Sequence, residues 1–269
     1  MPRLIPIALA LFSAAVAAHP GTGLVKDRTG NIYFTDLSNI WRIEPSGRRS
    51  IAVRNVHTHE LALDRQGRLV GEEVKYLGGE RYLHRVWRRE RSGEMHAIVP
   101  WTAGFWRRYG LVENAMGTRF WVTCPKQQCT LFSKTSRAPP SAMLRLERKD
   151  GHVNWLAPGP GDSLYFSSGR DVKIASAKHV ALFAENVGSQ LMGMHSVDRG
   201  QTVYVASYGD RAVYRLDGRT KTLAWRSPDP WGPTGAWRED DGSLLVLEYS
   251  RTNSVRARRV RMNGRSAIL

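Results

Sequence analysis

The group His57-Thr58-His59-Glu60 concentrates more ligand-type side chains than any other short stretch of the sequence. In an extended chain His57 and His59 project to one side and Glu60 to the other. Two imidazoles on one side can bind a divalent metal such as zinc, provided that a third ligand comes from elsewhere in the fold. His195 is the candidate for that ligand. The alternative is that His57 and His59 form loop hydrogen bonds and that His195 is a buried core residue.

Two further positions offer contacts to a bound molecule. The segment Trp231-Gly232-Pro233-Thr234 places an aromatic ring near a hydroxyl, and Tyr109 stands directly before Gly110-Leu111. Trp231 can equally pack between neighbouring parts of the fold. The sequence contains neither a Gly-x-Ser-x-Gly elbow nor a glycine-rich phosphate loop, so it gives no sign of a serine hydrolase or a nucleotide site of those types.

The two cysteines of the chain are Cys124 and Cys129. Cysteines this close in an exported chain favour a local disulfide that staples a loop. The other reading, a metal site, requires further ligands that the neighbouring sequence does not provide. We therefore predict a disulfide between them.

The first residues have the pattern of an export signal. Arg3 precedes an apolar run over residues 4–18, which ends in Val16-Ala17-Ala18. This pattern predicts a signal peptide over residues 1–18, cleaved before His19, whereas the alternative is an uncleaved anchor. The run falls short of the ~20 residues that a membrane-spanning helix requires, and no later stretch is as apolar. We expect a mature chain without a transmembrane segment in the periplasm or outside the cell.

The chain is strongly basic, with a formal net charge of +16. A positive field of this size attracts anionic partners, and an exported protein meets them on the anionic surface of the cell envelope. The alternative is a solvated basic surface without a dedicated partner. No basic cluster forms a known nucleic-acid motif, so nucleic acid is not the expected partner.

A repeat along the chain indicates the elements that would position these residues. Each unit begins with Gly followed by an apolar residue, turns at an Asp and a Gly, and continues into an apolar and aromatic strand, as in residues 23–36. The second strands begin near residues 32, 69, 120, 164, 203 and 244, which gives spacings between 37 and 51 residues. Such periods are typical of four-stranded propeller blades. The sequence therefore predicts an all-β, six-bladed β-propeller.

The predicted blades span approximately residues 19–56, 57–104, 105–141, 142–187, 188–228 and 229–269. Two segments fit less well. Residues 124–141 are polar and are interpreted as an inserted loop. Residues 155–160 contain two prolines, which leaves the fourth unit without a clear first strand and keeps five blades plus a degenerate one as the alternative. Asp36, Glu73 and Glu248 end equivalent strands and are expected to bond the backbone of the next turn.

Residues 27–36, 63–70 and 198–208 resemble the six-bladed propellers of the NHL-repeat and gluconolactonase, senescence-marker and strictosidine-synthase group. The resemblance implies a central channel lined by the first strand of each blade. In gluconolactonase-like members, acidic and Asn residues before several of these strands hold a divalent cation. The corresponding positions of this chain, none of them a carboxylate or Asn, are Thr22, His59, Tyr109, Met192 and Thr234.

Two functional hypotheses follow. The first is an exported propeller that binds a small molecule or a protein at the channel mouth without the gluconolactonase metal residues. The second is a metal-dependent hydrolase, of lactonase or esterase type, or a lyase, with zinc or calcium as the cofactor. The residues expected at the mouth are His57, His59, Glu60, Tyr109, His195, Trp231 and Thr234.

Overall fold

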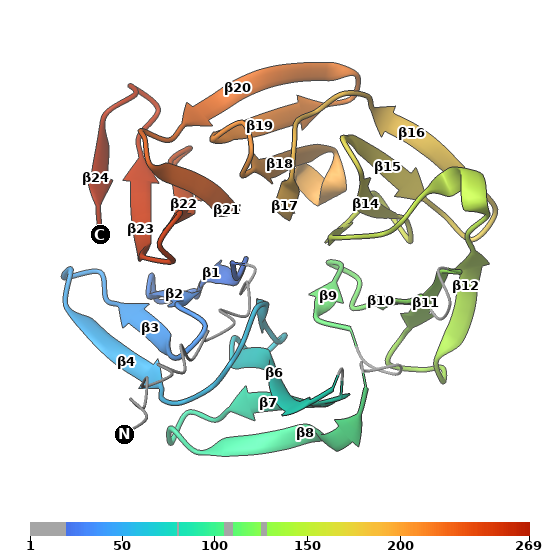
Figure 1. Cartoon of the computed structure of the whole chain (residues 1–269), viewed down its shortest axis with the longest axis horizontal. Coiled ribbons are helices and arrows are strands. Elements are labelled where there is room, and N and C mark those ends of the chain that lie inside the picture. Colours follow the sequence, from blue (N-terminus) through green and yellow to red (C-terminus); the bar gives the residue numbers. More distant parts are fainter. Residues whose placement is uncertain (1–19, 80, 105–109, 125–127) are drawn as a thin grey trace, which may run out of the picture.

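The chain forms a ring of six four-stranded antiparallel sheets around a central axis (Figure 1), as seen in a computed structural model that describes residues 20–79, 81–104, 110–124 and 128–269. In every sheet the four strands are consecutive in sequence. The predicted six-bladed β-propeller is confirmed. The predicted signal peptide, residues 1–18, and Tyr109 lie outside the described residues.

The first blade consists of β1 (Leu24–Lys26), β2 (Ile32–Thr35), β3 (Ile40–Ile43) and β4 (Arg49–Val53). The second consists of β5 (Leu61–Leu63), β6 (Leu69–Gly78), β7 (Arg81–Arg89) and β8 (Met95–Ala103). The third consists of β9 (Val112–Glu113), β10 (Arg119–Thr123), β11 (Thr130–Lys134) and β12 (Ser141–Arg145).

The fourth blade consists of β13 (Leu156–Pro158), β14 (Leu164–Ser168), β15 (Asp171–Ala175) and β16 (Val180–Ala184). The fifth consists of β17 (Leu191–Val197), β18 (Thr202–Ser207), β19 (Ala212–Asp217) and β20 (Thr220–Arg226). The sixth consists of β21 (Trp231–Arg238), β22 (Leu244–Ser250), β23 (Val255–Val260) and β24 (Ser266–Ile268). Two short 3-10 helices, η2 (Arg148–Asp150) and η3 (Asp198–Gly200), connect strands in the described parts.

The turn between the first two strands follows the predicted Asp and Gly chemistry. In the first blade, Asp27 Oδ1 accepts hydrogen bonds from the Thr29 and Asn31 amides, both at 2.9 Å. Gly30 has a φ of +87°, which is the left-handed region that glycine enters without strain. Asp64 and Gly67 repeat this arrangement in the second blade. This turn therefore fixes where the second strand begins in these two blades.

Three of the sequence predictions were wrong in detail. Residues 124–141 are not an inserted loop, because they contain β11 and the start of β12, with Leu131 fully buried. Since β12 extends to Arg145, the third blade ends beyond the predicted boundary at residue 141. The fourth blade has a first strand, in which Pro158 pairs with Leu164. Proline is tolerated there because the innermost strand is an edge of the sheet and has only one hydrogen-bonded neighbour.

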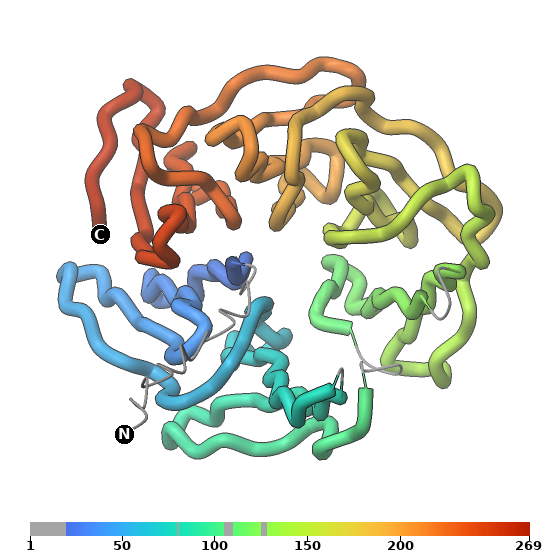
Figure 2. The backbone as a smooth tube through the Cα atoms, in the orientation of Figure 1, coloured from blue at the N-terminus to red at the C-terminus, as the bar shows by residue number. Residues whose placement is uncertain are grey.

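The ring closes by packing and side-chain bonds rather than by exchange of a strand. The last blade lies beside the first (Figure 2), and Leu24 and Phe34 share one apolar cluster with Leu245 and Leu247. The Tyr249 hydroxyl donates a hydrogen bond of 2.9 Å to the Thr35 carbonyl. Such packing between blades is the main source of stability for a repeat that cannot bury its own faces alone.

A second contact across this seam is ionic. The Lys26 Nζ lies 2.5 Å from Glu239 Oε1, and the same carboxylate lies 2.7 Å from the Arg259 Nε. Glu239 is buried, so its two cations provide the compensation that a desolvated carboxylate requires.

Candidate functional site

A cavity of about 290 Å³ lies on the ring axis, and the first strands of all six blades line it. Aliphatic side chains such as Leu61, Leu111 and Met194 form part of its walls. Trp155 and Trp237 add aromatic surface. The polar side chains in this lining are Thr22, Glu60, Glu113, His195 and Ser196. The cavity is thus the central channel that the resemblance implied.

Glu60 lines this channel just before β5. Burial raises the pKa of Glu60 to about 7, and the nearby charge of Glu72 adds to the effect, while His59 opposes it. A carboxyl group with a pKa near neutrality can bind a ligand as a hydrogen-bond donor or as an anion. This property is common among functional carboxyl groups in clefts.

His59 turns away from Glu60 toward the body of the second blade. Its Nδ1 lies 3.0 Å from Glu72 Oε1, and its backbone amide donates to the same oxygen at 3.0 Å. The His59 carbonyl accepts hydrogen bonds from the Thr22 and Gly23 amides, both at 2.8 Å. His59 therefore joins the first two blades and holds Glu72 next to Glu60.

Glu72 is a buried residue in the middle of β6. In addition to the two bonds from His59, it faces the buried His84, whose Nε2 lies 4.0 Å from Glu72 Oε2. Burial lowers the pKa of His84, with the hydrogen bond to the Gly104 carbonyl and the charge of Glu72 acting in the opposite direction. The sequence analysis missed Glu72 because it lies within a strand, without a motif of its own.

His57 lies beside His59, with ring centroids 4.7 Å apart and nearly perpendicular ring planes. Its Nδ1 lies 2.9 Å from the Leu37 carbonyl. Neither His57 nor His59 is among the residues that line the channel, although the next residue, Glu60, is. Their observed bonds match the interpretation of these histidines as loop hydrogen-bonding residues.

His195 lines the channel from β17 and stacks on Trp237, with ring centroids 4.2 Å apart and an interplanar angle of 24°. Burial lowers the pKa of His195 to about 4. The imidazole is therefore neutral at physiological pH and contributes an aromatic and weakly polar surface to the wall. Trp237 was missed, although its place after Gly235-Ala236 in the repeat marks a first strand.

Two further predicted residues, Trp231 and Thr234, belong to β21 but do not line the channel. Trp231 begins β21, where the Arg256 guanidinium covers its ring at 3.9 Å from the centroid. Thr234 is buried in the same strand, with its Oγ1 3.5 Å from the Leu247 carbonyl. Neither residue lines the cavity.

The residues present do not fit a gluconolactonase-type metal centre. Thr22, His59, Met192 and Thr234 offer no carboxylate at the positions that the resemblance assigns to ligands. Across the described ranges, donor atoms from three His, Cys, Asp or Glu residues converge only at Cys124, Cys129 and His152. The structure therefore does not bring His57, His59 and His195 together as one ligand set.

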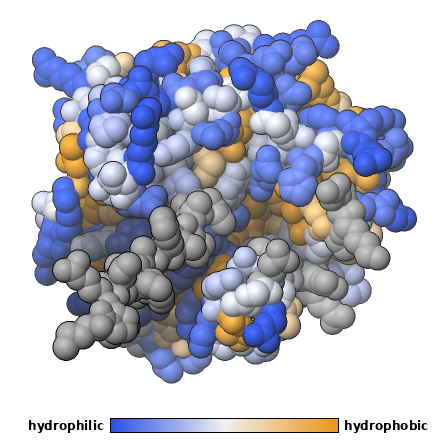
Figure 3. Space-filling view, in the orientation of Figure 1, coloured by the Kyte–Doolittle hydropathy of each residue, from blue (hydrophilic) through white to orange (hydrophobic). Residues whose placement is uncertain are grey.

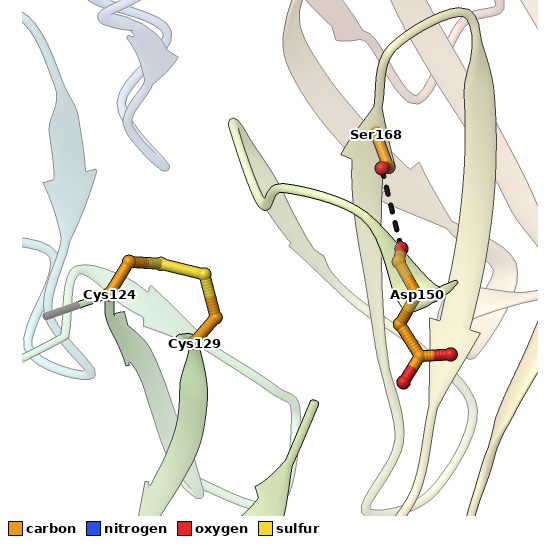
Figure 4. The surroundings of a disulfide bond; sticks show 4 residues. All are labelled: Cys124, Cys129, Asp150 and Ser168. Atoms are coloured by element: carbon orange, nitrogen blue, oxygen red, sulfur yellow. Dashed lines mark hydrogen bonds between the residues drawn. A yellow bond between two sulfur atoms is a disulfide. The ribbon is translucent and has the colours of Figure 1, made fainter. Parts of the chain in front are cut away.

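Cys124 and Cys129 form the predicted disulfide. It joins β10 to β11 at the end of the hairpin of the third blade (Figure 4), outside the channel lining. Because both sulfur atoms are in the disulfide, they are not available as thiolate ligands beside His152.

The expected roles of three carboxylates are confirmed only in part. Asp36 Oδ1 accepts hydrogen bonds from the Ser38 and Asn39 amides, as predicted. Glu73 instead pairs with Arg85, at 2.5 Å. Glu248 likewise binds arginines of the next strand, as described below.

No protein-family model matches the sequence, and a search of curated proteins finds no match. Solved structures match most of the chain. A gluconolactonase from Xanthomonas campestris superposes with a TM-score of 0.60 at 18% identity, over 84% of this chain and 83% of that one. Virginiamycin B lyase from Staphylococcus aureus gives 0.58 at 12%, over 93% and 84%.

Regucalcin from Agrobacterium tumefaciens, described as a calcium-binding protein, gives a TM-score of 0.55 at 14% identity, over 86% of this chain and 82% of that one. At such low identities the likeness shows the fold and not the chemistry. The chain shares the six-bladed β-propeller fold of gluconolactonase and regucalcin-like proteins.

Proposed function

We propose that this protein binds a small, mainly apolar organic molecule in its central channel, with Glu60 as the polar anchor. The observation that carries the proposal is the axial cavity of about 290 Å³, whose wall combines aliphatic and aromatic side chains with a substantial polar surface. Small-molecule sites also combine apolar side chains with polar groups, and their volumes begin at about 300 Å³.

The charge of the lining restricts the ligand further. The chain has 40 Lys and Arg residues, yet none is among the described residues that line the cavity. Glu113 is part of the lining but is paired with Arg65 and Arg119. Glu60 therefore dominates the electrostatics of the site, which favours neutral or cationic ligands over anionic ones.

Fluorescence titration with the uncharged dye N-phenyl-1-naphthylamine tests the proposal. We expect one equivalent to bind with a blue-shifted emission, because aliphatic and aromatic side chains form part of the channel wall. Met194→Trp fills the channel and is expected to weaken binding at least tenfold. Met262→Trp is the matched control, since Met262 is 80% exposed on the outside of the sixth blade. Equal dye binding by Met194→Trp and the wild-type protein would refute the proposed site.

Metal analysis separates this function from the alternative, a metal-dependent hydrolase or lyase with the same fold. For a binding protein, we expect zinc and calcium well below one equivalent after purification without chelators. Stoichiometric zinc or calcium that is lost in His59→Ala would favour the alternative.

We further propose that the protein acts in the periplasm or outside the cell. The apolar leader over residues 1–18 and the disulfide between Cys124 and Cys129 support export to an oxidising compartment. Among the described residues, the structure includes no helix with the length and apolarity needed to span a membrane. Amino-terminal sequencing of protein from the envelope fraction is expected to give His19 as the first residue.

A further inference from the structure

The second blade extends beyond its inner strand. The hairpin of β6 and β7 is built from strands of 10 and 9 residues, whereas β5 pairs only with Leu69 to Gly71. Seven residues of β6 therefore continue past the last inner pair, about 23 Å at 3.3 Å per residue. Gly78 and Gly79, both with positive φ, form the turn at the tip.

Large apolar side chains are exposed on this extension. Tyr76 is 55% exposed, Leu77 is 42% exposed, and Trp101 on the adjacent β8 is 39% exposed. The Tyr76 ring lies 5.3 Å from the Tyr82 ring across the hairpin. The other exposed large hydrophobic residues of the described chain are dispersed over separate elements: Met116, Leu182, Leu223, Met262 and Ile268. Several exposed apolar side chains on one extension are a sign of an interaction surface.

Basic side chains accompany these apolar residues. The Arg85 guanidinium lies 4.8 Å from the centroid of the Trp101 ring. Lys75 and Arg81 are exposed near the tip, and neither has a carboxylate within ion-pair distance among the described residues. Hydrophilic residues cover much of the face of the molecule seen in Figure 3, and the whole chain is strongly positive. The extension thus presents aromatic and aliphatic side chains within a positive field.

We propose that this extension, named the blade-two wedge and defined by residues 74–78, 81–85 and 100–103, docks on an anionic lipid bilayer. Tyrosine and tryptophan partition to the headgroup region, Leu77 reaches the acyl boundary, and lysine and arginine pair with anionic headgroups. An acidic polysaccharide would use the positive charges but would leave Tyr76 and Leu77 in water. The wedge is independent of the channel, so either proposal can fail without the other.

Co-sedimentation of the full chain with vesicles tests the wedge. Wild-type protein is expected to bind vesicles of phosphatidylcholine and phosphatidylglycerol at 3:1, and to bind pure phosphatidylcholine at least tenfold more weakly. The double variant Tyr76→Ser/Leu77→Ser is expected to lower the partition coefficient on anionic vesicles at least fivefold. The control, Leu182→Ser/Met262→Ser, removes two exposed apolar side chains elsewhere and is expected to bind like the wild-type protein.

Two additional sets of measurements help to interpret the vesicle-binding result. An unchanged urea midpoint and unchanged dye binding in the channel confirm that Tyr76→Ser/Leu77→Ser is folded. Lys75→Gln/Arg81→Gln is expected to reduce binding to anionic vesicles and the steepness of its salt dependence. The inference is overturned if the wild-type protein does not bind anionic vesicles. It is also overturned if the serine double variant binds as the wild-type protein does, because attachment would then be adhesion by charge alone.

Discussion

Tyr249 and Thr35 are 214 residues apart in sequence, yet the tyrosine hydroxyl bonds the threonine carbonyl at 2.9 Å across the seam of the ring. Both residues are buried, so water does not replace this hydrogen bond if it is removed. The contact joins the second strand of the first blade to the corresponding strand of the last. Removing this hydrogen bond therefore tests how much the contact between the first and last blades contributes to stability.

Tyr249→Phe is expected to lower the free energy of unfolding by about 1–3 kcal/mol, because the Thr35 carbonyl loses its side-chain partner in a buried site. Urea unfolding followed by circular dichroism measures the change. Tyr76→Phe removes an exposed hydroxyl and is the control, with an expected change within about 0.5 kcal/mol. Equal midpoints for the wild-type protein and Tyr249→Phe would contradict a stabilising role for this bond.

Glu248 is fully buried between two arginines, with its Oε2 2.5 Å from the Arg256 Nε and 3.1 Å from the Arg258 Nε. Glu248→Ala leaves both guanidinium groups without their buried partner, and we expect a loss of about 3–5 kcal/mol in the free energy of unfolding. Chemical denaturation measures it. Glu94→Ala, at an exposed site, is the comparison, and similar losses in both variants would contradict the prediction.

Glu60 and His195 are expected to act in opposite directions on the pH dependence of stability. Between pH 4.5 and about 7 the folded state keeps a proton on Glu60 that the unfolded state has lost, so the free energy of unfolding falls as pH rises. Between about pH 4 and 6.5 the unfolded state protonates His195 while the folded state does not, so stability rises with pH. The two contributions largely cancel near pH 5 to 6.5.

Single substitutions separate these contributions. The carboxyl group of Glu60 stabilises the wild-type protein less as the pH rises, and Glu60→Gln lacks this group. When the free energy of unfolding of the variant is compared with that of the wild-type protein, the difference is therefore expected to be about 2–3 kcal/mol more in favour of the variant at pH 7.5 than at pH 4.5. His195→Phe keeps an aromatic ring on Trp237 and is expected to shift the profile in the opposite sense. Urea unfolding at a series of pH values provides the test. Parallel profiles for the three proteins would show that neither group titrates as inferred.

The disulfide closes a loop between residues 124 and 129. Cys124→Ser/Cys129→Ser is expected to lower the free energy of unfolding by about 2 kcal/mol, the value that chain entropy gives for so short a loop. Urea unfolding of the wild-type protein with and without reductant provides an internal check, since the reduced protein is expected to match the double variant. No effect of reductant on the midpoint would contradict the prediction.

The repeat allowed the architecture to be predicted because its turn chemistry is local: an Asp that bonds amides two and four residues ahead, and a Gly with positive φ, are visible in the sequence. The predictions of a missing first strand around Pro158 and of a loop over residues 130–134 were wrong for physical reasons. Proline excludes a central strand but not an inner edge strand, and the alternation around Leu131 was obscured by the polar residues on both sides.

Two different signals pointed to the candidate site. Glu60 belongs to the group His57-Thr58-His59-Glu60, His195 lies in a first strand marked by the repeat, and Trp237 follows from the same rule as His195. Glu72 could not be found, because its importance arises from contacts with His59, which precedes β5, and with His84 on β7. The side to which each histidine turns depends on those contacts and not on spacing along the chain.

The contiguity of each blade has a consequence for biosynthesis. Since every sheet uses four successive strands, a nascent chain can complete one blade from residues that have already left the ribosome, before the next is translated. In the six sheets that the structure describes, each strand therefore pairs only with strands that are close to it in sequence. Only the apolar surfaces at the two ends of the growing arc stay open until the carboxyl-terminal residues emerge and join them.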